Sequence, residues 1–171
     1  MTHSHIPGLL VMAALSFCLL PGNSVAQQKT LKEQLVGAWT LVSADTTPSN
    51  GVKRQDFGAS PRGILVLDAG GRYAVVQGNP HRPKFKDTSN LRLGATAEEF
   101  AVAARSFAAN FGTWSINEAD KTLIRKYEIA LIPNNDSIET KVSTSINGDD
   151  LKLTGTATNG DRGEAVYRRA K

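Results

Sequence analysis

Residues 35–43 read LVGAWTLVS, and this stretch decides the fold. Gly37 permits the close approach of another backbone or of a ring, and a tryptophan follows two positions later. The residues after it favour β-structure. We expect a strand over residues 36–44 that opens a closed antiparallel sheet, because most later segments also read as short strands. The alternation places three side chains on one face of this strand: Trp39, Leu41 and Ser43.

Turn sequences such as Asn147-Gly148 and Asn159-Gly160 separate seven further short strands. We expect them over residues 63–68, 72–77, 113–116, 122–131, 138–146, 151–156 and 164–169. Eight short strands at regular spacing predict an all-β fold, an eight-stranded antiparallel barrel, with a sandwich as the alternative. Eight strands enclose either packed side chains or one small ligand.

Two helical segments accompany the strands. Thr30 and Glu33 have the spacing of a capping box and predict a helical turn over residues 30–34. Thr96 and Glu99 repeat that spacing and begin one inserted α-helix, expected over residues 96–109. Its apolar residues follow a helical period: Phe100, Ala103, Ala104, Phe107 and Phe111.

The first 26 residues are expected to be a signal peptide. Residues 6–20 are almost wholly apolar, and small residues precede a cleavage point after Ala26, although no Lys or Arg stands before the apolar run. An uncleaved membrane anchor is the alternative. Residues 27–171 then form one domain, periplasmic or secreted, with no membrane partner after cleavage. Because Cys18 is the only cysteine, this domain depends on packing rather than on disulfides.

Several stretches of the chain resemble the bacterial and fungal lipocalin-like domain family, with Gly37-x-Trp39 similar to the G-x-W opening of lipocalins. The matching segments are residues 36–43, 61–65, 68–73, 111–114 and 167–169. The resemblance implies a calycin-type barrel with a possible cavity and no assigned activity. It also implies that an arginine of the last strand, Arg168 or Arg169, stacks over Trp39 and closes one end of the barrel.

The composition argues against several other functions. The net charge of +4 is spread along strands in alternating signs, which does not indicate a nucleic-acid partner. His81 is the only histidine after residue 26, so we expect no metal site, and no cofactor is implied. His81 lies in a proline-flanked loop with no nucleophile elbow near it, so we assign no catalytic residue.

Arg125 is the most informative single residue, because it lies among apolar side chains on a face that points inward. It pairs with an internal acid, or it meets an anionic or carbonyl group of a ligand, or a slip in register turns it to solvent. The loop 78–95 is basic and either steers anions toward the barrel or is simply solvated. The expected ligand-binding residues are Arg125, Tyr127, Tyr73, Trp114, His81 and Arg82.

The function expected from these features is binding of a small, partly apolar or anionic molecule, without catalysis. The loop 78–95 and the helix 96–109 would form a lid. One alternative is an isomerase or cyclase, which should add an inward acid or base with a perturbed pKa. The other is a filled barrel that acts as an interaction module and shows an exposed apolar patch.

Overall fold

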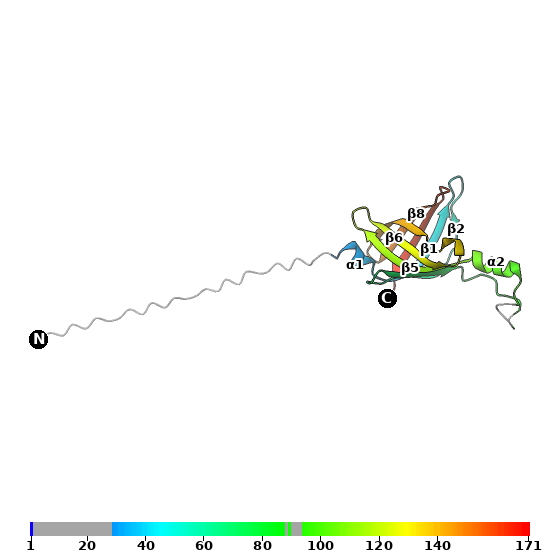
Figure 1. Ribbon diagram of the computed structural model, residues 1–171, viewed down its shortest axis with the longest axis horizontal. Coiled ribbons are helices and arrows are strands. Elements are labelled where there is room, and N and C mark those ends of the chain that lie inside the picture. The colour runs from blue at the N-terminus through cyan, green and yellow to red at the C-terminus, as the bar shows by residue number, and fades with distance from the viewer. Residues whose placement is uncertain (2–28, 88, 90–93) are drawn as a thin grey trace.

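The computed structural model describes residues 1, 29–87, 89 and 94–171. Apart from Met1, the expected signal peptide lies outside these residues. In the described part of the chain, eight antiparallel strands close into a barrel (Figure 1), which confirms the predicted fold class. The strands are β1 (Gly37–Thr47), β2 (Arg54–Gln55), β3 (Arg62–Leu67), β4 (Arg72–Gly78), β5 (Phe107–Asn117), β6 (Thr122–Ala130), β7 (Glu139–Asn147), β8 (Asp150–Thr156) and β9 (Arg162–Arg169).

Each barrel strand pairs with the next along the chain, and β9 returns to pair with β1. The closing register runs from Trp39 opposite Arg169 to Thr47 opposite Arg162. The short strand β2 pairs only with the end of β1 and adds no strand to the closed wall. Helix α1 (Leu31–Leu35) precedes the barrel, helix α2 (Ala97–Arg105) lies between β4 and β5, and a 3-10 turn, η1 (Pro133–Asn135), joins β6 to β7.

One end of the barrel is filled and sealed. Thr30 and Glu33 form the predicted capping box of α1, and the first backbone N–H groups of this helix donate to the Glu118 carboxylate at 3.0 and 2.9 Å. That contact ties α1 to the β5–β6 turn. The largest fully buried side chains lie at this end and are 0% exposed: Leu35, Trp39, Leu65, Leu67, Leu123 and Leu151. We call this part the closed half of the barrel.

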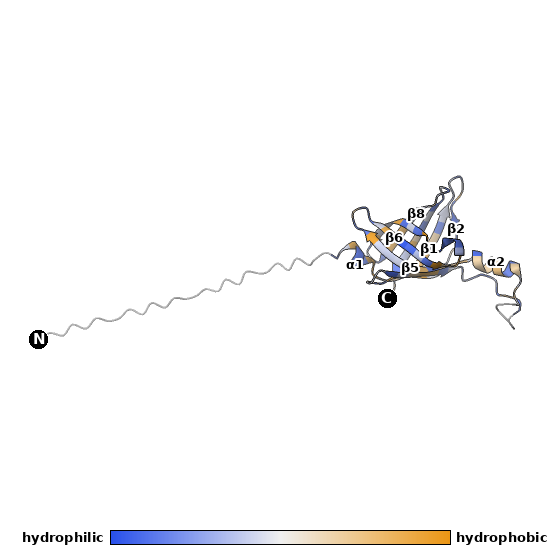
Figure 2. Cartoon of the chain, in the orientation of Figure 1, coloured by the Kyte–Doolittle hydropathy of each residue, from blue (hydrophilic) through white to orange (hydrophobic). Residues whose placement is uncertain are grey.

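Helix α2 is shorter than the prediction, which was wrong at its C-terminal end. The Ser106 hydroxyl donates to the carbonyls of Val102 and Ala103 and ends the helix there. Phe107 and Phe111 belong to β5, where they pair with β4 residues. The sheet pairing outweighs the helical periodicity of the sequence, as tertiary context often does. The helix carries both apolar and polar residues (Figure 2) and buries none of them.

Two bulges change which side chains face inward. The first lies between Leu41 and Ser43 and turns Ser43 to the outer face, contrary to the alternation expected from the sequence. The second lies on β6, where Glu128 is the extra residue between Tyr127 and Ile129. As a result Ile129 and Leu131 face outward and Ala130 faces the interior, whereas an unbroken alternation from Arg125 and Tyr127 would place Ile129 and Leu131 inside.

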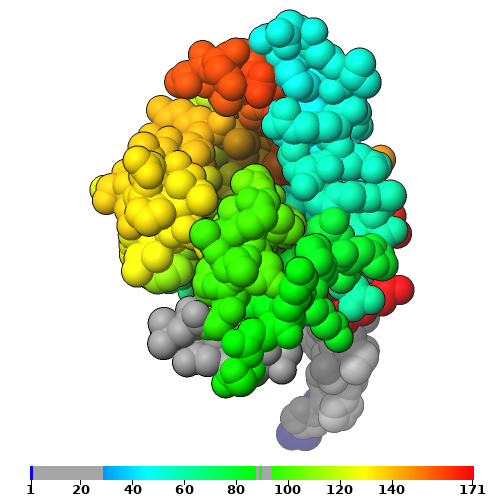
Figure 3. Space-filling view, turned by 90° about the vertical axis from the view of Figure 1, so that its right-hand side faces the viewer, coloured from blue at the N-terminus to red at the C-terminus, as the bar shows by residue number. Residues whose placement is uncertain are grey.

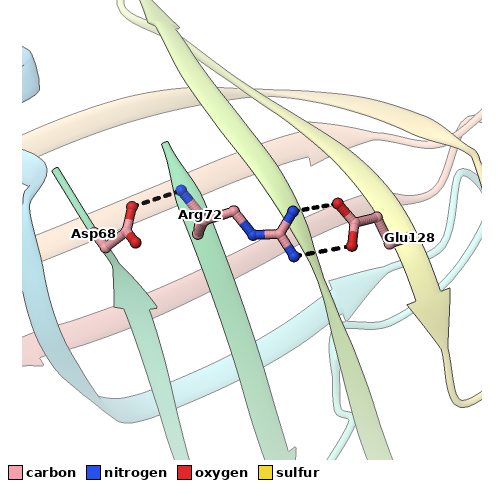
Figure 4. Close-up of polar contacts among 3 residues, drawn as sticks. All are labelled: Asp68, Arg72 and Glu128. Carbon is pink, nitrogen blue, oxygen red and sulfur yellow. Dashed lines mark hydrogen bonds and ion pairs between the residues drawn. The ribbon is translucent and has the colours of Figure 1, made fainter. Parts of the chain in front are cut away.

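The Glu128 bulge is held from outside the wall (Figure 4). Both carboxylate oxygens of Glu128 accept hydrogen bonds from the Arg72 guanidinium, which reaches across β5 from β4. The backbone N–H of Arg72 donates to the Asp68 carboxylate at 2.6 Å, which fixes the start of β4. The hydrogen bonds from Arg72, together with its charge, hold the pKa of Glu128 below its ordinary value. This pair links β4 to β6 across β5 at the point where the register changes.

Candidate ligand-binding site

The other half of the interior is lined by small side chains. They are Ala44, Gly63, Ala108, Ala130, Gly155, Gly163 and Ala165, placed inward by the alternation of their strands. All but Ala44 are only partly buried although they face the barrel axis, so water reaches them. The space-filling view shows this end hollowed between the loops that surround it (Figure 3). We call it the open half.

Arg125 lies between the two halves. It projects inward from β6, two residues after the fully buried Leu123 and two before Tyr127. Its guanidinium carbon is 5.8 Å from the centre of the Tyr73 ring and 5.9 Å from that of Tyr127. The inner end of the open half is therefore formed by a cation that lies between two aromatic rings.

The guanidinium of Arg125 has no acceptor in the part of the chain that the structure describes. Its Nε atom is buried without a hydrogen-bond partner, and no described carboxylate lies within ion-pair distance. Thr144 Oγ1, buried on β7, is likewise without a partner. A buried N–H group without an acceptor costs free energy, and a planar carboxylate would satisfy it and form a second, parallel hydrogen bond with the guanidinium.

Polar side chains surround this cation. The Tyr73 hydroxyl donates to Asn110 Oδ1 at 2.9 Å, and the Tyr167 hydroxyl donates to Gln77 Oε1 at 3.0 Å. Burial raises the pKa of Tyr167 to about 12, although the nearby charge of Arg125 partly offsets it, and burial raises the pKa of Tyr73 as well. Both phenols are therefore neutral hydrogen-bonding groups at physiological pH. The positive charge of Arg125 dominates the electrostatics of the site.

Comparison with known protein families shows which family this barrel belongs to. A family model described as a lipocalin-like domain matches residues 36–169, from the residue before β1 to the end of β9. The chain belongs to this family. No curated protein matches the sequence. In the described residues of this lipocalin-like domain, no helix is long and apolar enough to cross a membrane.

Three solved barrels are similar in fold. A redesigned β-barrel covers 84% of this chain and 100% of its own, with 12% identity and a TM-score of 0.42. A de novo designed fluorescence-activating β-barrel covers 80% and 95%, with 10% identity and a TM-score of 0.39. A mutant of the fluorescent protein UnaG covers 81% and 97%, with 15% identity and a TM-score of 0.37.

The closed end of this lipocalin-like domain has the stacked pair that the family resemblance implied, and the arginine is Arg169. Its guanidinium carbon lies 4.1 Å from the centre of the Trp39 ring, and it donates to the carbonyls of Gln34 and Val36. Gly37 has a φ of 133°, and a Cβ there would lie 3.3 Å from Arg169 Nη1. Arg168 instead points outward and pairs with Asp150 at 2.9 Å.

The structure brings together only some of the residues expected to bind ligand. Arg125, Tyr73 and Tyr127 form one cluster. Trp114 packs in the closed half, where its indole N–H donates to the Asp68 carbonyl at 3.0 Å. His81 is exposed in the loop after β4, and Arg82 stacks on Phe107 outside the wall at 4.9 Å.

Four polar residues of the interior were not among the predicted ligand-binding residues: Gln77, Asn110, Thr144 and Tyr167. Alternation along β4 and β9 would have found Gln77 and Tyr167, since both lie an even number of residues from apolar inward positions. Asn110 was expected in the connection between the helix 96–109 and the strand 113–116, so its inward position on β5 was not predicted.

Proposed function

We propose that this lipocalin-like domain binds a small amphipathic anion, most simply a carboxylic acid, inside the open half of its barrel. The carboxylate would accept hydrogen bonds from Arg125, and the apolar part would lie against the small residues toward the mouth. The observation that carries the proposal is the Arg125 guanidinium, which lies inside the barrel without an acceptor among the described residues. A bound carboxylate removes that cost and gains a charge-assisted pair.

The depth of the site limits the length of the ligand. Ala130, the last residue of β6, is five positions beyond Arg125. At the rise of a β-strand, and because the Glu128 bulge shortens the path and the strand is tilted, this is at most roughly 16 Å along the wall from Arg125 to the rim. A medium-length acyl chain or a compact ring system bearing one acid would fill that depth. A longer molecule would protrude through the mouth.

Binding is favoured over catalysis by the titration behaviour of the inward groups. The pKa values of Tyr73 and Tyr167 are raised, which moves these phenols further from neutral pH. A general base needs the opposite, a pKa close to the working pH. The partly exposed small residues also favour a hollow barrel over a filled one.

We also propose that the protein acts outside the cytoplasm. The apolar run over residues 6–20 and the small residues before Ala26 support export to the periplasm or the medium. There the protein would carry its ligand as a soluble complex. Mass analysis of the N-terminus of protein isolated from the producing cells tests this, since an intact Met1 would contradict cleavage.

Native mass spectrometry with matched probes tests the ligand class. Dodecanoate and dodecanol share one alkyl chain and differ in charge. We expect wild-type protein to retain dodecanoate and to bind dodecanol at least tenfold more weakly. Arg125→Met should lose this preference, whereas Arg125→Lys should keep part of it because the charge remains. Equal binding of both probes by wild-type protein would contradict an anion site.

A further inference from the structure

A second cavity lies outside the barrel wall, beside the mouth. Its volume is about 680 Å³, and its walls include Arg82, Lys84, Phe85, Phe100, Phe107 and Leu131. Phe107 and Leu131 alternate with Ala108 and Ala130, which face the interior, so both point away from the barrel axis. The cavity is therefore separated from Arg125 by the strands β5 and β6. It lies against the described residues of the excursion between β4 and β5, 79–87, 89 and 94–106, which we call the lobe (Figure 3).

The lobe is tied together although its helix buries no residue. The Asn79 N–H donates to the Ser106 carbonyl at 2.9 Å and closes the base of the lobe. The Lys86 N–H donates to the Glu99 carboxylate at 2.9 Å and joins the loop to the start of α2. Phe85 and Phe100 meet edge to face, with ring centres 5.3 Å apart. These contacts hold the cavity walls on both sides.

The position of Arg82 is fixed by its contacts with the end of β4 and with Phe107. Its guanidinium carbon lies 4.9 Å from the centre of the Phe107 ring. A Cβ at residue 78 would lie 2.7 Å from Phe107 Cδ2 and 3.0 Å from Arg82 Nη1, so a glycine is needed there. The strand end, the ring and the guanidinium therefore form one packed unit.

The charges at this cavity favour an anion. Among the described residues, no carboxylate lies within ion-pair distance of Arg82 or Lys84. The nearest acids of α2 are occupied, because Glu98 pairs with Arg105 at 3.1 Å and Glu99 accepts from Thr96 and Lys86. Two cations at the edge of an aromatic cavity match an aromatic molecule with one acidic group.

We propose that the lobe is a second binding site, specific for an aromatic monoanion such as an aryl carboxylate or sulfonate. The ring would lie against Phe85, Phe100 and Phe107, and the acid would meet Arg82 and Lys84. The volume is within the range of small-molecule pockets. This site does not depend on the function proposed for the barrel interior, because different strand faces and different cations form the two.

Fluorescence titration with anilinonaphthalene sulfonate tests the lobe site, and an Arg125→Met background removes the interior cation. We expect one equivalent of the probe to bind in that background. Ala104→Trp should abolish the binding by filling the cavity, and Arg82→Gln with Lys84→Gln should weaken it at least tenfold. Lys152→Gln, which lies outside the lobe, is the matched control and should change nothing.

Two results would overturn the proposal. One is probe binding that Ala104→Trp and the double charge variant leave unchanged, and the other is no binding in the Arg125→Met background. Circular dichroism and thermal unfolding verify that the variants keep the barrel. If the charge variant retains full affinity while dodecanoate still distinguishes Arg125→Met from wild type, the lobe site fails and the interior site stands.

Discussion

Arg125 contributes charge where the fold itself does not need it. Its neighbours on the interior face are aromatic rings and neutral polar groups, and its Nε atom is buried without a partner among the described residues. Under the proposed function, the role of Arg125 is to bind the ligand rather than to stabilise the fold. The two roles can be separated, because stability is measured without ligand and affinity with it.

Replacing Arg125 by Met should therefore stabilise the ligand-free protein. Met has similar length and no polar atom to satisfy, so we expect the free energy of unfolding to rise by about 1 kcal/mol, the lower end of the cost of an unpaired polar group. Urea denaturation of both proteins measures this. A decrease in stability would mean that the guanidinium has structural partners and would remove the argument for a ligand.

The buried phenols make stability depend on alkaline pH. The pKa of Tyr167 is raised to about 12 in the folded protein, whereas a free tyrosine titrates near 10. The unfolded chain therefore loses this proton first, and stability should fall as the pH rises from about 10 to about 12. Tyr167→Phe should flatten this part of the profile. Denaturation series at several alkaline pH values test it, and an unchanged slope in the variant would contradict the assignment.

Arg169 packs inside against Trp39, whereas its neighbour Arg168 lies at the surface, so substitutions of the two arginines can be compared directly. Arg169→Ala removes the stack on Trp39 and two hydrogen bonds to α1, so we expect a loss of roughly 2 kcal/mol or more. Arg168→Ala removes only a surface pair and should leave the unfolding midpoint almost unchanged. Equal losses from the two substitutions would show that the stack does not close the barrel.

At the scale of elements, the sequence predicted the strands well and their irregularities poorly. Turn residues and alternation predicted that each barrel strand exists, although β5 begins at Phe107 rather than at residue 113, and of the alternatives left open for Arg125 the structure shows the inward one. The bulge at Glu128 was not predicted because alternation assumes an unbroken register. One extra residue exchanges the inward and outward faces for every later residue of the strand. The contact that fixes it, with Arg72, joins residues that are distant in the sequence.

The end of α2 was mispredicted for a related reason. Phe107 and Phe111 are four residues apart, and this spacing puts two side chains on one face of a helix and also on one face of a strand. The local pattern is therefore equally consistent with both structures. Pairing with β4, which brings Gly78 opposite Phe107, decides in favour of the strand.

The lobe should be separable from the barrel. The hydrogen bond from Asn79 to Ser106 closes its base, Arg82 stacks on Phe107 of β5, and helix α2 buries none of its residues. We expect that replacing residues 80–105 by a short glycine-containing turn leaves the unfolding midpoint within a few degrees of wild type. Such a protein should keep dodecanoate binding and lose binding of the aromatic sulfonate. Loss of the barrel on excision would show that the lobe is part of the folding unit.

The whole molecule is divided into a closed half that stabilises the fold and an open half that leaves space. Large side chains with 0% exposure fill the first, and glycines and alanines line the second. At Gly163 a Cβ would meet nothing nearer than the Gly155 carbonyl oxygen at 4.0 Å, so the interior has room there. The sequence suggested a barrel, but this gradient depends on which residues share a level of the wall. Only the register gives that information.

Filling this space should block the site without unfolding the protein. We expect Gly163→Leu to keep the stability of wild type within about 1 kcal/mol, because its side chain enters solvent-filled space rather than packed core. The same variant should bind dodecanoate at least tenfold more weakly. Full affinity in Gly163→Leu would place the ligand elsewhere.

The most direct test of a carboxylate on Arg125 is nuclear magnetic resonance of the arginine Nε–H groups during titration with dodecanoate. The Arg125 signal can be assigned by its absence in Arg125→Met. We predict that this signal shifts strongly and exchanges more slowly with water as the ligand saturates, while that of Arg168 stays in place. A saturated protein whose Arg125 signal has not moved would contradict the account.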